Sequence, residues 1–352
     1  MKILQVLLSP RIGGAEALAD SLCTEWSAMG AVCKTHYLDA DNGSGRSRSR
    51  RVMSLSRTIR KWRPDIVVGH SALPNLYSRL VAPKRVPVVT VLHSATDDFA
   101  GRSLRWSERL ARHRTAAIVA VSQGQIDQYA KHFGCGVPIR LIPNGIRRDA
   151  HPKEQFQEVP LHAVTVARVA RQKNPRVWIE AARLISLHGP DLQLEWWGPH
   201  SVDGDTEDVF GKASLEGTRG SYRGATTDPI SALKSSDLLF HPADREAHSI
   251  GILEAAAVGL PVVCSSTVAE TLPTEIVAVS FTDGVAESAV EALQTVCDDW
   301  AHYAARALAA APGIIEEFSI SRCASKYVEL FEELLRAPAE ESRPASVDHA
   351  KP

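Results

Sequence analysis

Short β-branched runs that are apolar from end to end recur through the first half of the chain, and they limit its possible folds. A strand of this type has both faces buried, which is typical of a parallel sheet with helices on either side. Helical patterns near residues 15–29, 52–62 and 74–81 lie between the runs. The alternation predicts a doubly wound α/β domain. The predicted strands are residues 2–8, 31–38, 65–70, 86–93, 116–122 and 139–145.

The pattern stops at residues 147–160, a polar stretch with two prolines that we interpret as an interdomain linker. It then resumes, which predicts a second α/β domain of the same kind, with a long polar loop at 199–219. Two such Rossmann-like domains leave a cleft at the carboxyl ends of their strands, where ligands bind in sheets of this type. The elements expected in the second half are strands at 161–168, 192–198, 236–242 and 261–266 and helices at 175–187, 285–311 and 319–336.

Composition favours a cytoplasmic globular protein. Hydrophobic residues make up 44% of the 352 residues and charged residues 23%, and no apolar run approaches the ~20 residues that span a bilayer. The N-terminal run reads as a first strand and not as a signal peptide. The cysteines include no CxxC pair, so we expect reduced, mostly buried thiols and no metal site. They are Cys23, Cys33, Cys135, Cys264, Cys297 and Cys323.

Charge is divided unevenly along the chain. Residues 1–158 carry 24 Lys and Arg against 13 Asp and Glu, a net charge of +11, whereas the whole chain has a net charge of −1. This excess favours an anionic partner such as a phosphate, an acidic acceptor or a membrane, although a chance imbalance of surface charge explains it equally well.

The strongest basic segment is residues 42–64, with eight Lys and Arg and no acid. Its apolar residues recur at helical spacing, so its second part is an amphipathic helix with a basic face. Three interpretations stay open. The apolar stripe packs on the domain core and leaves the cations in solvent, or residues 46–63 contact the inner face of an anionic membrane, or they contact a soluble anionic acceptor.

Two features of the first half are candidates for ligand contacts. Gly13 and Gly14 lie between the first strand and its helix, where backbone N–H groups can approach an anion; a tight turn alone is the alternative. His93 ends a predicted strand, so its side chain is expected in the cleft, but a structural histidine is the alternative. His70 has the same placement on a neighbouring strand.

The second half has three further candidate features. Arg168 and Lys173 follow a strand and could clamp a diphosphate, or they are exposed loop cations. The run Ala243–Gly251 leads into a helix expected to begin near Ile250, with Ser249 as its N-cap and free N–H groups for a phosphate. Glu246 and Glu254 flank that helix start and suit sugar hydroxyls; solvated surface acids are the alternative.

Several blocks together resemble a known family. Glu246 and Glu254 with seven residues between them, followed by LEAAAVGLPVV, look like the Glu-x7-Glu signature of retaining GT-B glycosyltransferases of family 4, the glycosyl transferases group 1 family. The blocks GGAE, VS, IPNGI and VARVARQKN match further family blocks in the right order. They begin at residues 13, 121, 142 and 166.

The resemblance implies an enzyme with two Rossmann-like domains: an N-terminal acceptor domain at 1–155 and a C-terminal donor domain at 156–318. A helix at 319–336 is expected to pack back on the first domain, and a disordered tail is expected at 337–352. The implied reaction moves a sugar from a nucleotide-sugar, a UDP-hexose or UDP-N-acetylhexosamine, to a hydroxylated small molecule, lipid carrier or glycan. No metal, other cofactor or nucleic acid is implied.

The resemblance also implies residue roles. Arg168 and Lys173 bind the donor diphosphate, and Gly14 faces the phosphates. Glu246 contacts the transferred sugar, Glu254 contacts the ribose, and His93 lies near the reacting carbon. The expected catalytic residues are His93, Arg168, Lys173 and Glu246, and the expected donor contacts are Gly13, Gly14, Arg168, Lys173, Arg223, Glu246, His248, Ser249, Ile250, Gly251 and Glu254.

The chain departs from the family pattern near the transferred sugar. The family often has Gly-Phe-Gly where Ala247, His248 and Ser249 stand, and the run 267–273 differs too. The identity of the sugar is therefore open. Another GT-B nucleotide-sugar enzyme, such as an epimerase, and a non-catalytic nucleotide-sugar-binding protein are the alternatives.

Overall fold

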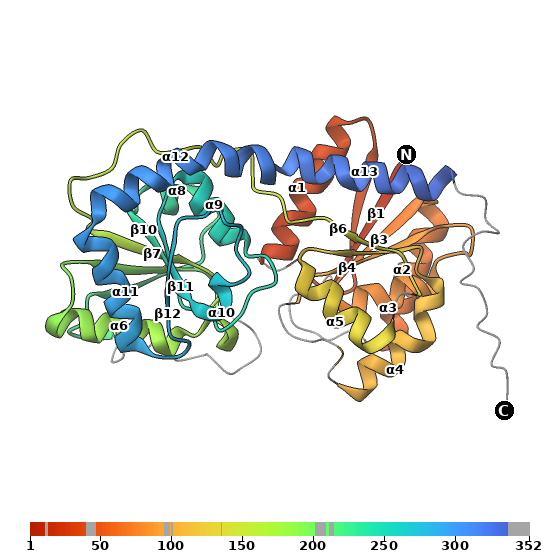
Figure 1. Ribbon diagram of the computed structural model, residues 1–352. Coiled ribbons are helices and arrows are strands. Elements are labelled where there is room, and N and C mark those ends of the chain that lie inside the picture. The colour runs from red at the N-terminus through yellow and green to blue at the C-terminus, as the bar shows by residue number, and fades with distance from the viewer. Residues whose placement is uncertain are drawn as a thin grey trace, which may run out of the picture. The chain divides into compact units, whose positions relative to one another are not determined.

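A computed structural model describes residues 1–10, 13–39, 47–94, 99, 101–134, 136–200, 209–210 and 215–336 (Figure 1). The chain forms two compact units. Unit 1 is Met1–Pro143 with the described residues from Ser321 onward, and unit 2 is Asn144–Ile320. The tail expected at 337–352 and residues 201–208 and 211–214 of the expected 199–219 loop lie outside the described residues.

Unit 1 is built on a six-stranded parallel sheet in the order β2-β1-β3-β4-β5-β6. In the central strands β3 and β4 every residue is buried because helices cover the sheet, whereas the edge strands β2 and β6 contain no buried residue. The strands are β1 (Lys2–Leu7), β2 (Val32–Tyr37), β3 (Ile66–His70), β4 (Val88–Leu92), β5 (Ala117–Ala120) and β6 (Ile139–Leu141). The helices are α1 (Gly14–Ala28), α2 (Arg48–Trp62), α3 (Ala72–Val81), α4 (Arg102–Ala111), the 3₁₀ turn η1 (Arg112–Arg114) and α5 (Gln123–Phe133).

The last helix of the described chain, α13 (Ile320–Arg336), packs on α1. The indole of Trp26 donates to the carbonyl of Ala324 at 3.2 Å, and its ring meets Tyr327 and Phe331 edge-on. Helix α13 therefore returns to the unit that contains the N-terminus, and Figure 1 shows it running beside α1.

Unit 2 repeats the architecture with a parallel sheet in the order β12-β11-β10-β7-β8-β9. The strands are β7 (His162–Val166), β8 (Gln193–Trp197), β9 (Gly220–Gly224), β10 (Leu238–His241), β11 (Val262–Ser265) and β12 (Ala278–Phe281). The helices are η2 (Arg171–Lys173), α6 (Pro175–His188), α8 (Pro229–Lys234), α9 (Ile250–Val258), α10 (Ser266–Ala269), α11 (Ala286–Asp298) and α12 (Trp300–Phe318). The predicted pair of Rossmann-like domains is thus confirmed.

The interpretation of residues 147–160 as a linker is wrong. Ala150 is buried in the core of unit 2, Phe156 packs on Trp300, and the ammonium of Lys153 donates to the carbonyl of Ser236 at 2.5 Å. The division between the units accordingly lies at Pro143–Asn144 and not at residue 155. Two prolines and a polar sequence are typical of an irregular segment, whether it links two domains or packs on one of them.

The helix of the basic segment follows the first of its three interpretations. Leu55 and Ile59 of α2 are buried in the core of unit 1, and Val52 and Trp62 pack against that core. Its apolar stripe is therefore occupied by the protein itself, while Arg57 and Lys61 are exposed. Residues 42–46 lie outside the described part of the chain.

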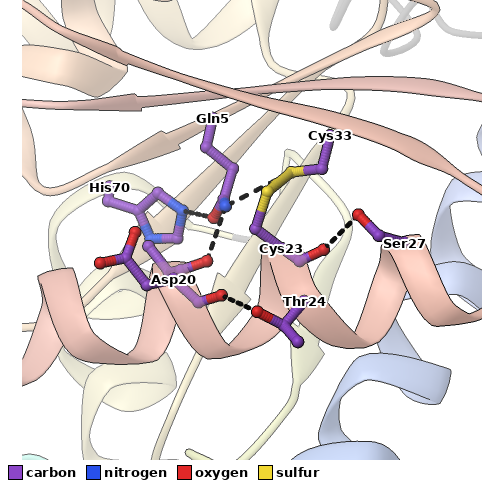
Figure 2. Close-up of a disulfide and its surroundings, with 8 residues drawn as sticks. Gln5, Asp20, Cys23, Thr24, Ser27, Cys33 and His70 are labelled. Carbon is purple, nitrogen blue, oxygen red and sulfur yellow. Dashed lines mark hydrogen bonds between the residues drawn. A yellow bond between two sulfur atoms is a disulfide. The ribbon is translucent and has the colours of Figure 1, made fainter.

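The expectation of six reduced thiols is wrong for two cysteines. Cys23 on α1 and Cys33 on β2 form a disulfide, with their Cα atoms 5.5 Å apart (Figure 2). Scattered positions concealed this pairing, because only the fold brings α1 alongside β2. Cys264, Cys297 and Cys323 are free thiols, and Cys135 is not among the described residues.

None of the helices in the described ranges has both the length and the apolar character needed to cross a membrane.

Candidate active site

The polar residues of unit 2 gather at the point where its sheet changes direction. β7 and β10 are neighbours, and the chain continues from β7 toward β8 on one side and from β10 toward β11 on the other. Loops after two such strands diverge and leave a crevice at their carboxyl ends. The loop after β7 carries Lys173, and the loop after β10 carries Glu246.

These two loops are tied together by three hydrogen bonds. The backbone N–H of Asp244 donates to the carbonyl of Gln172 at 2.9 Å, and the Gln172 amide donates to the carbonyl of Arg245 at 2.8 Å. The amide of Asn174 donates to the carboxylate of Asp244 at 2.7 Å, while its own oxygen caps α6. Lys173 and Glu246 are therefore held in place by their neighbours.

Glu246 is the centre of a buried cluster. One carboxylate oxygen, Oε1, accepts from the Lys173 ammonium and lies 2.8 Å from Nε2 of His241, the last residue of β10. Burial alone would raise the pKa of Glu246, but the cationic Lys173 and the hydrogen bond from His241 hold that pKa at about 2. Burial lowers the pKa of His241. Glu246 is therefore a carboxylate throughout the physiological pH range.

Glu254 has the opposite electrostatic environment. It lies inside α9, is 4% exposed, and its Oε1 is 3.2 Å from Nε of Arg147. Burial raises its pKa to about 7; Arg147 opposes the rise and Asp149 adds to it. The alternative that the two glutamates are solvated surface acids is thus wrong, and the site holds one carboxyl group with a lowered pKa and one with a raised pKa.

Helix α9 begins at Ile250, as expected, with Ser249 in the N-cap position. The Ser249 hydroxyl makes no capping hydrogen bond, so the first N–H groups of this nine-residue helix are not capped by that side chain. A Cβ on Gly251 would lie 3.1 Å from the carbonyl oxygen of Val166 at the end of β7. Glycine there lets the helix start come close to the central strand, a geometry that suits an anion.

His248 serves to hold the segment that precedes unit 2's first strand. Its Nδ1 accepts from the backbone N–H of Asn144 at 3.3 Å, and its carbonyl accepts from the Asn144 amide at 2.8 Å. Its ring packs on Phe318, and burial lowers its pKa to about 4. A neutral imidazole thus occupies a place where the family often has phenylalanine.

A second polar group lies in unit 1, at the equivalent change of direction between β1 and β3. His93 follows β4, and its Nε2 is 2.9 Å from Nδ1 of His70 at the end of β3. His70 Nε2 is 2.9 Å from Oε1 of Gln5 in the middle of β1, and Gln5 Nε2 donates to the carbonyl of Ala19 at 2.8 Å. Figure 2 shows Gln5 between His70 and the disulfide; its Nε2 is 3.6 Å from Sγ of Cys33.

This chain of hydrogen bonds fixes the tautomers of both histidines. Because the Gln5 nitrogen donates to Ala19, its oxygen faces His70 and must accept, so His70 carries its proton on Nε2. His70 Nδ1 is then an acceptor, and His93 donates from Nε2 and keeps an unprotonated Nδ1. Burial lowers the pKa of His93 to about 4 and that of His70 well below its usual value, so both rings are neutral at pH 7. We call Gln5, His70 and His93 the histidine relay.

The remaining predicted residues are placed less closely. Gly13 and Gly14 stand at the start of α1, as expected. Arg168 is exposed after β7, and no hydrogen bond or ion pair within the described residues joins its guanidinium to Lys173 or Glu246. Arg223 lies on the edge strand β9, where its guanidinium pairs with Glu195 at 2.6 Å. The structure therefore pairs Lys173 directly with Glu246, whereas it does not join Arg168 or Arg223 to that pair.

Four polar residues of these groups were not predicted. His241 ends β10 just as His70 and His93 end their strands, so the same rule could have found it. Gln5 is a polar residue among apolar neighbours in the middle of β1, a pattern that indicates a buried hydrogen-bonding role. Asn144 and Arg147 gave no local signal, since their partners are about a hundred residues away in the chain.

Comparisons with known proteins identify the class. The model for Glycosyltransferase Family 4 matches residues 34–150, and the model for Glycosyl transferases group 1 matches residues 146–310. The fold and these two matches define a GT-B protein. The chain belongs to the family 4, group 1 glycosyltransferases and is an enzyme of that class.

Individual relatives are distant. The chain is 24% identical over 307 residues to an Escherichia coli protein named UDP-Gal:alpha-D-GlcNAc-diphosphoundecaprenol alpha-1,3-galactosyltransferase, covering 76% of this chain and 79% of that protein. It is 25% identical over 167 residues to the D-inositol 3-phosphate glycosyltransferase of Paenarthrobacter aurescens, covering 43% of this chain and only 41% of that relative. The crystal structure of Anabaena HepE with UDP and glucose matches 95% of this chain and 100% of its own, with a TM-score of 0.77 and 16% identity.

Proposed function

We propose that the chain is a retaining glycosyltransferase that moves a sugar from a UDP-hexose or UDP-N-acetylhexosamine to an acceptor hydroxyl. The observation that carries this proposal is the cluster of Lys173, Glu246 and His241 near the start of α9, which the Ser249 side chain does not cap. It combines a cation and free N–H groups for a diphosphate with an ionised carboxylate for sugar hydroxyls. The HepE complex with UDP and the E. coli relative's UDP-Gal donor support the choice of nucleotide.

In this proposal the leaving diphosphate is stabilised by Lys173, Arg168 and the N-terminus of α9. The bond from the sugar's anomeric carbon to the phosphate oxygen breaks, and negative charge gathers on the diphosphate. Preorganised positive groups are most effective where charge develops. The acceptor oxygen attacks from the face that the diphosphate leaves, and its proton passes to a phosphate oxygen. The products are the glycosylated acceptor and UDP.

The two glutamates have different proposed roles. Glu246, ionised next to Lys173, orients the transferred sugar and favours the positive charge that its ring gains. Glu254 accepts from the ribose hydroxyls, a part of the donor that stays unchanged during the reaction. Neutral His93 accepts from a sugar hydroxyl at Nδ1, and Gly14 lies against the phosphates. Arg223 is proposed to contact the nucleotide base, and it would give up its ion pair with Glu195 to do so.

The proposed mechanism uses no metal. Turnover should therefore survive thorough EDTA treatment, and restoration of lost turnover by Mg²⁺ or Mn²⁺ would contradict the proposal. Asp203 and Asp205, the acidic pair nearest to a metal-binding pattern, lie outside the described residues.

The deciding experiment separates the glutamates by kinetics and binding. Glu254→Gln should raise KM for the donor and weaken UDP alone by about tenfold, because its contact is equal in the ground and transition states. Glu246→Gln should lower kcat more than it raises KM and leave UDP binding nearly intact. Calorimetry with UDP on both variants tests this, and loss of UDP only in Glu246→Gln would reverse the roles.

A companion assay tests the reaction class. Mass spectrometry of UDP-sugars incubated with and without candidate acceptors should show UDP and a glycosylated product only when an acceptor is present. Conversion of the donor to an isomeric UDP-sugar without acceptor would identify an epimerase. The acceptor classes to be screened are small molecules, lipid carriers and glycans.

A further inference from the structure

Helix α4 of unit 1 has an inner face that fixes its orientation. Its one acidic residue, Glu108, is buried, accepts from Arg79 of α3 at 2.6 Å and from the hydroxyl of Tyr129 of α5 at 2.8 Å. Leu104 and Ser107 lie on the same side and face Leu76 and Leu92. Since three elements anchor this face, the opposite face of α4 is held outward.

The outward face combines cations with large apolar side chains. Arg102, Arg105, Trp106 and Arg109 line one surface hollow. Trp106 is 66% exposed, and Leu110, one turn further along, is 54% exposed. Residues three and four apart share a helix face, so the arginines and the Trp106–Leu110 pair lie side by side. We call these five residues the α4 surface.

We propose that the α4 surface binds an anionic lipid bilayer. The exposed Arg102 and Arg109 match lipid phosphates in charge. Their aliphatic stems can lie along the headgroup region while the guanidinium groups reach the phosphates. Tryptophan is enriched at membrane interfaces because its ring is apolar and its N–H is polar. Leu110 adds exposed apolar surface that can be buried at the boundary between the lipid headgroups and the acyl chains.

Other occupants fit the surface less well. A second copy of this chain would bring its own Arg102 and Arg109 against these two, and the like charges would repel. An acidic protein or a nucleic acid would pair with the arginines but leave Leu110 without an apolar partner. Helix α2, the other strongly basic helix of unit 1, has its apolar stripe packed on the core, and Met53, at 60%, is the large apolar side chain that it exposes. It therefore offers less exposed apolar area beside its cations than α4, which exposes both Trp106 and Leu110.

Co-sedimentation of the full chain with vesicles tests the proposal. Vesicles of phosphatidylcholine with roughly 30% phosphatidylglycerol supply the negative surface, and pure phosphatidylcholine is the neutral comparison. The charge variant is R102E/R109E, which changes two exposed arginines, and the apolar variant is W106S/L110S. The matched control is R57E/K61E on α2, which makes the same charge change on the same unit. All four positive side chains involved are exposed, so unchanged melting temperatures are expected.

The wild type should bind the anionic vesicles and not the neutral ones. R102E/R109E should weaken binding by more than about tenfold, since each cation near such a surface contributes roughly fivefold. W106S/L110S should weaken it several-fold and make the remainder more sensitive to salt, whereas R57E/K61E should change it less than about threefold. Absence of wild-type binding, equal loss in both charge variants, or undiminished binding by W106S/L110S would each overturn the proposal.

Discussion

At the scale of single residues, the two glutamates of the signature differ in protonation because of what surrounds them. Glu246 has an ammonium and an imidazole as partners, which hold its pKa at about 2, and Glu254 has one poorly aligned guanidinium and a pKa of about 7. Environments that push two carboxyl pKa values apart are typical of sites with divided roles. The separation gives physical support to the different roles proposed for the two residues.

Glu254 should destabilise the fold at high pH. Its pKa is raised from 4.5 to about 7 on folding, so the folded state holds the proton more tightly. Stability is therefore lost as pH rises from about 4.5 through 7, and the full penalty is present above 7. Glu254→Gln, which does not titrate, should raise the free energy of unfolding by about 1–3 kcal/mol at pH 8 and far less at pH 5. Urea unfolding at the two pH values measures this.

The stability gained by Glu254→Gln should be accompanied by weaker UDP binding. A variant that is more stable and yet binds UDP less well would mark Glu254 as a residue kept for function. Equal stability gains at pH 5 and pH 8 would show that the carboxyl group is not protonated in the folded state near neutral pH.

The histidine relay predicts that Gln5 positions His93 through His70. Gln5→Met removes the acceptor for His70 Nε2, so both rings can change tautomer. Because one orienting hydrogen bond is lost, kcat/KM should fall about tenfold. Gln5→Glu keeps an acceptor at that place and should recover most of the activity. Nitrogen-15 NMR of the His93 ring should show unprotonated Nδ1 in the wild type and mixed tautomers in Gln5→Met. Identical spectra and activities in the two variants would contradict a positioning role.

The sequence predicted the charged members of the site but not their partners. Glu246, Glu254 and Lys173 follow strand ends or begin a helix, and such positions can be recognised locally. What Glu254 pairs with depends on Arg147, more than a hundred positions away, and on burial that no local pattern reports. Ser249 shows the same limit, since its N-cap position was predictable but its lack of a capping hydrogen bond was not.

At the scale of elements, the buried strands were predictable because parallel strands must be apolar on both faces. The edge strands β9 and β12 were missed, since one side of an edge strand faces solvent and its sequence is mixed. Helix α4 was also missed, because four of its ten residues are arginine or glutamate and its buried face contains an ion pair.

The close approach of α9 to β7 should depend on Gly251. Gly251→Ala places a methyl group 3.1 Å from the Val166 carbonyl, so the helix start must shift by a few tenths of an ångström. The N–H groups proposed to bind the diphosphate shift with it, and UDP affinity should fall several-fold at a stability cost of about 1 kcal/mol. Gly313→Ala in α12, where no atom lies within 4 Å of the new methyl group, is the control and should leave UDP binding unchanged. Calorimetry compares UDP binding by the two variants. Equal affinities would show that the start of α9 does not bind the phosphates.

At the scale of the whole molecule, each unit has its own sheet and its own core, and the chain passes between the units twice, near residues 143 and 320. The residues proposed to bind UDP, apart from the Gly13–Gly14 turn, all belong to unit 2. Ligand binding stabilises the part of a protein that forms its site. UDP is therefore expected to act mainly on unit 2.

Hydrogen exchange with and without UDP measures this distribution. At about a hundredfold excess over its Kd, UDP stabilises its binding unit by about 2.7 kcal/mol, which slows exchange through opening of that unit about a hundredfold. Peptides covering residues 171–174 and 244–258 should show this protection, because their N–H groups open only when the site opens. Peptides from β3, β4 and α4 of unit 1 should keep their rates, and Glu254→Gln should reduce the protection from about a hundredfold to about tenfold at the same UDP concentration. Equal protection of β3 and β4 would show that UDP stabilises both units together, and the nucleotide would then not be assigned to unit 2 alone.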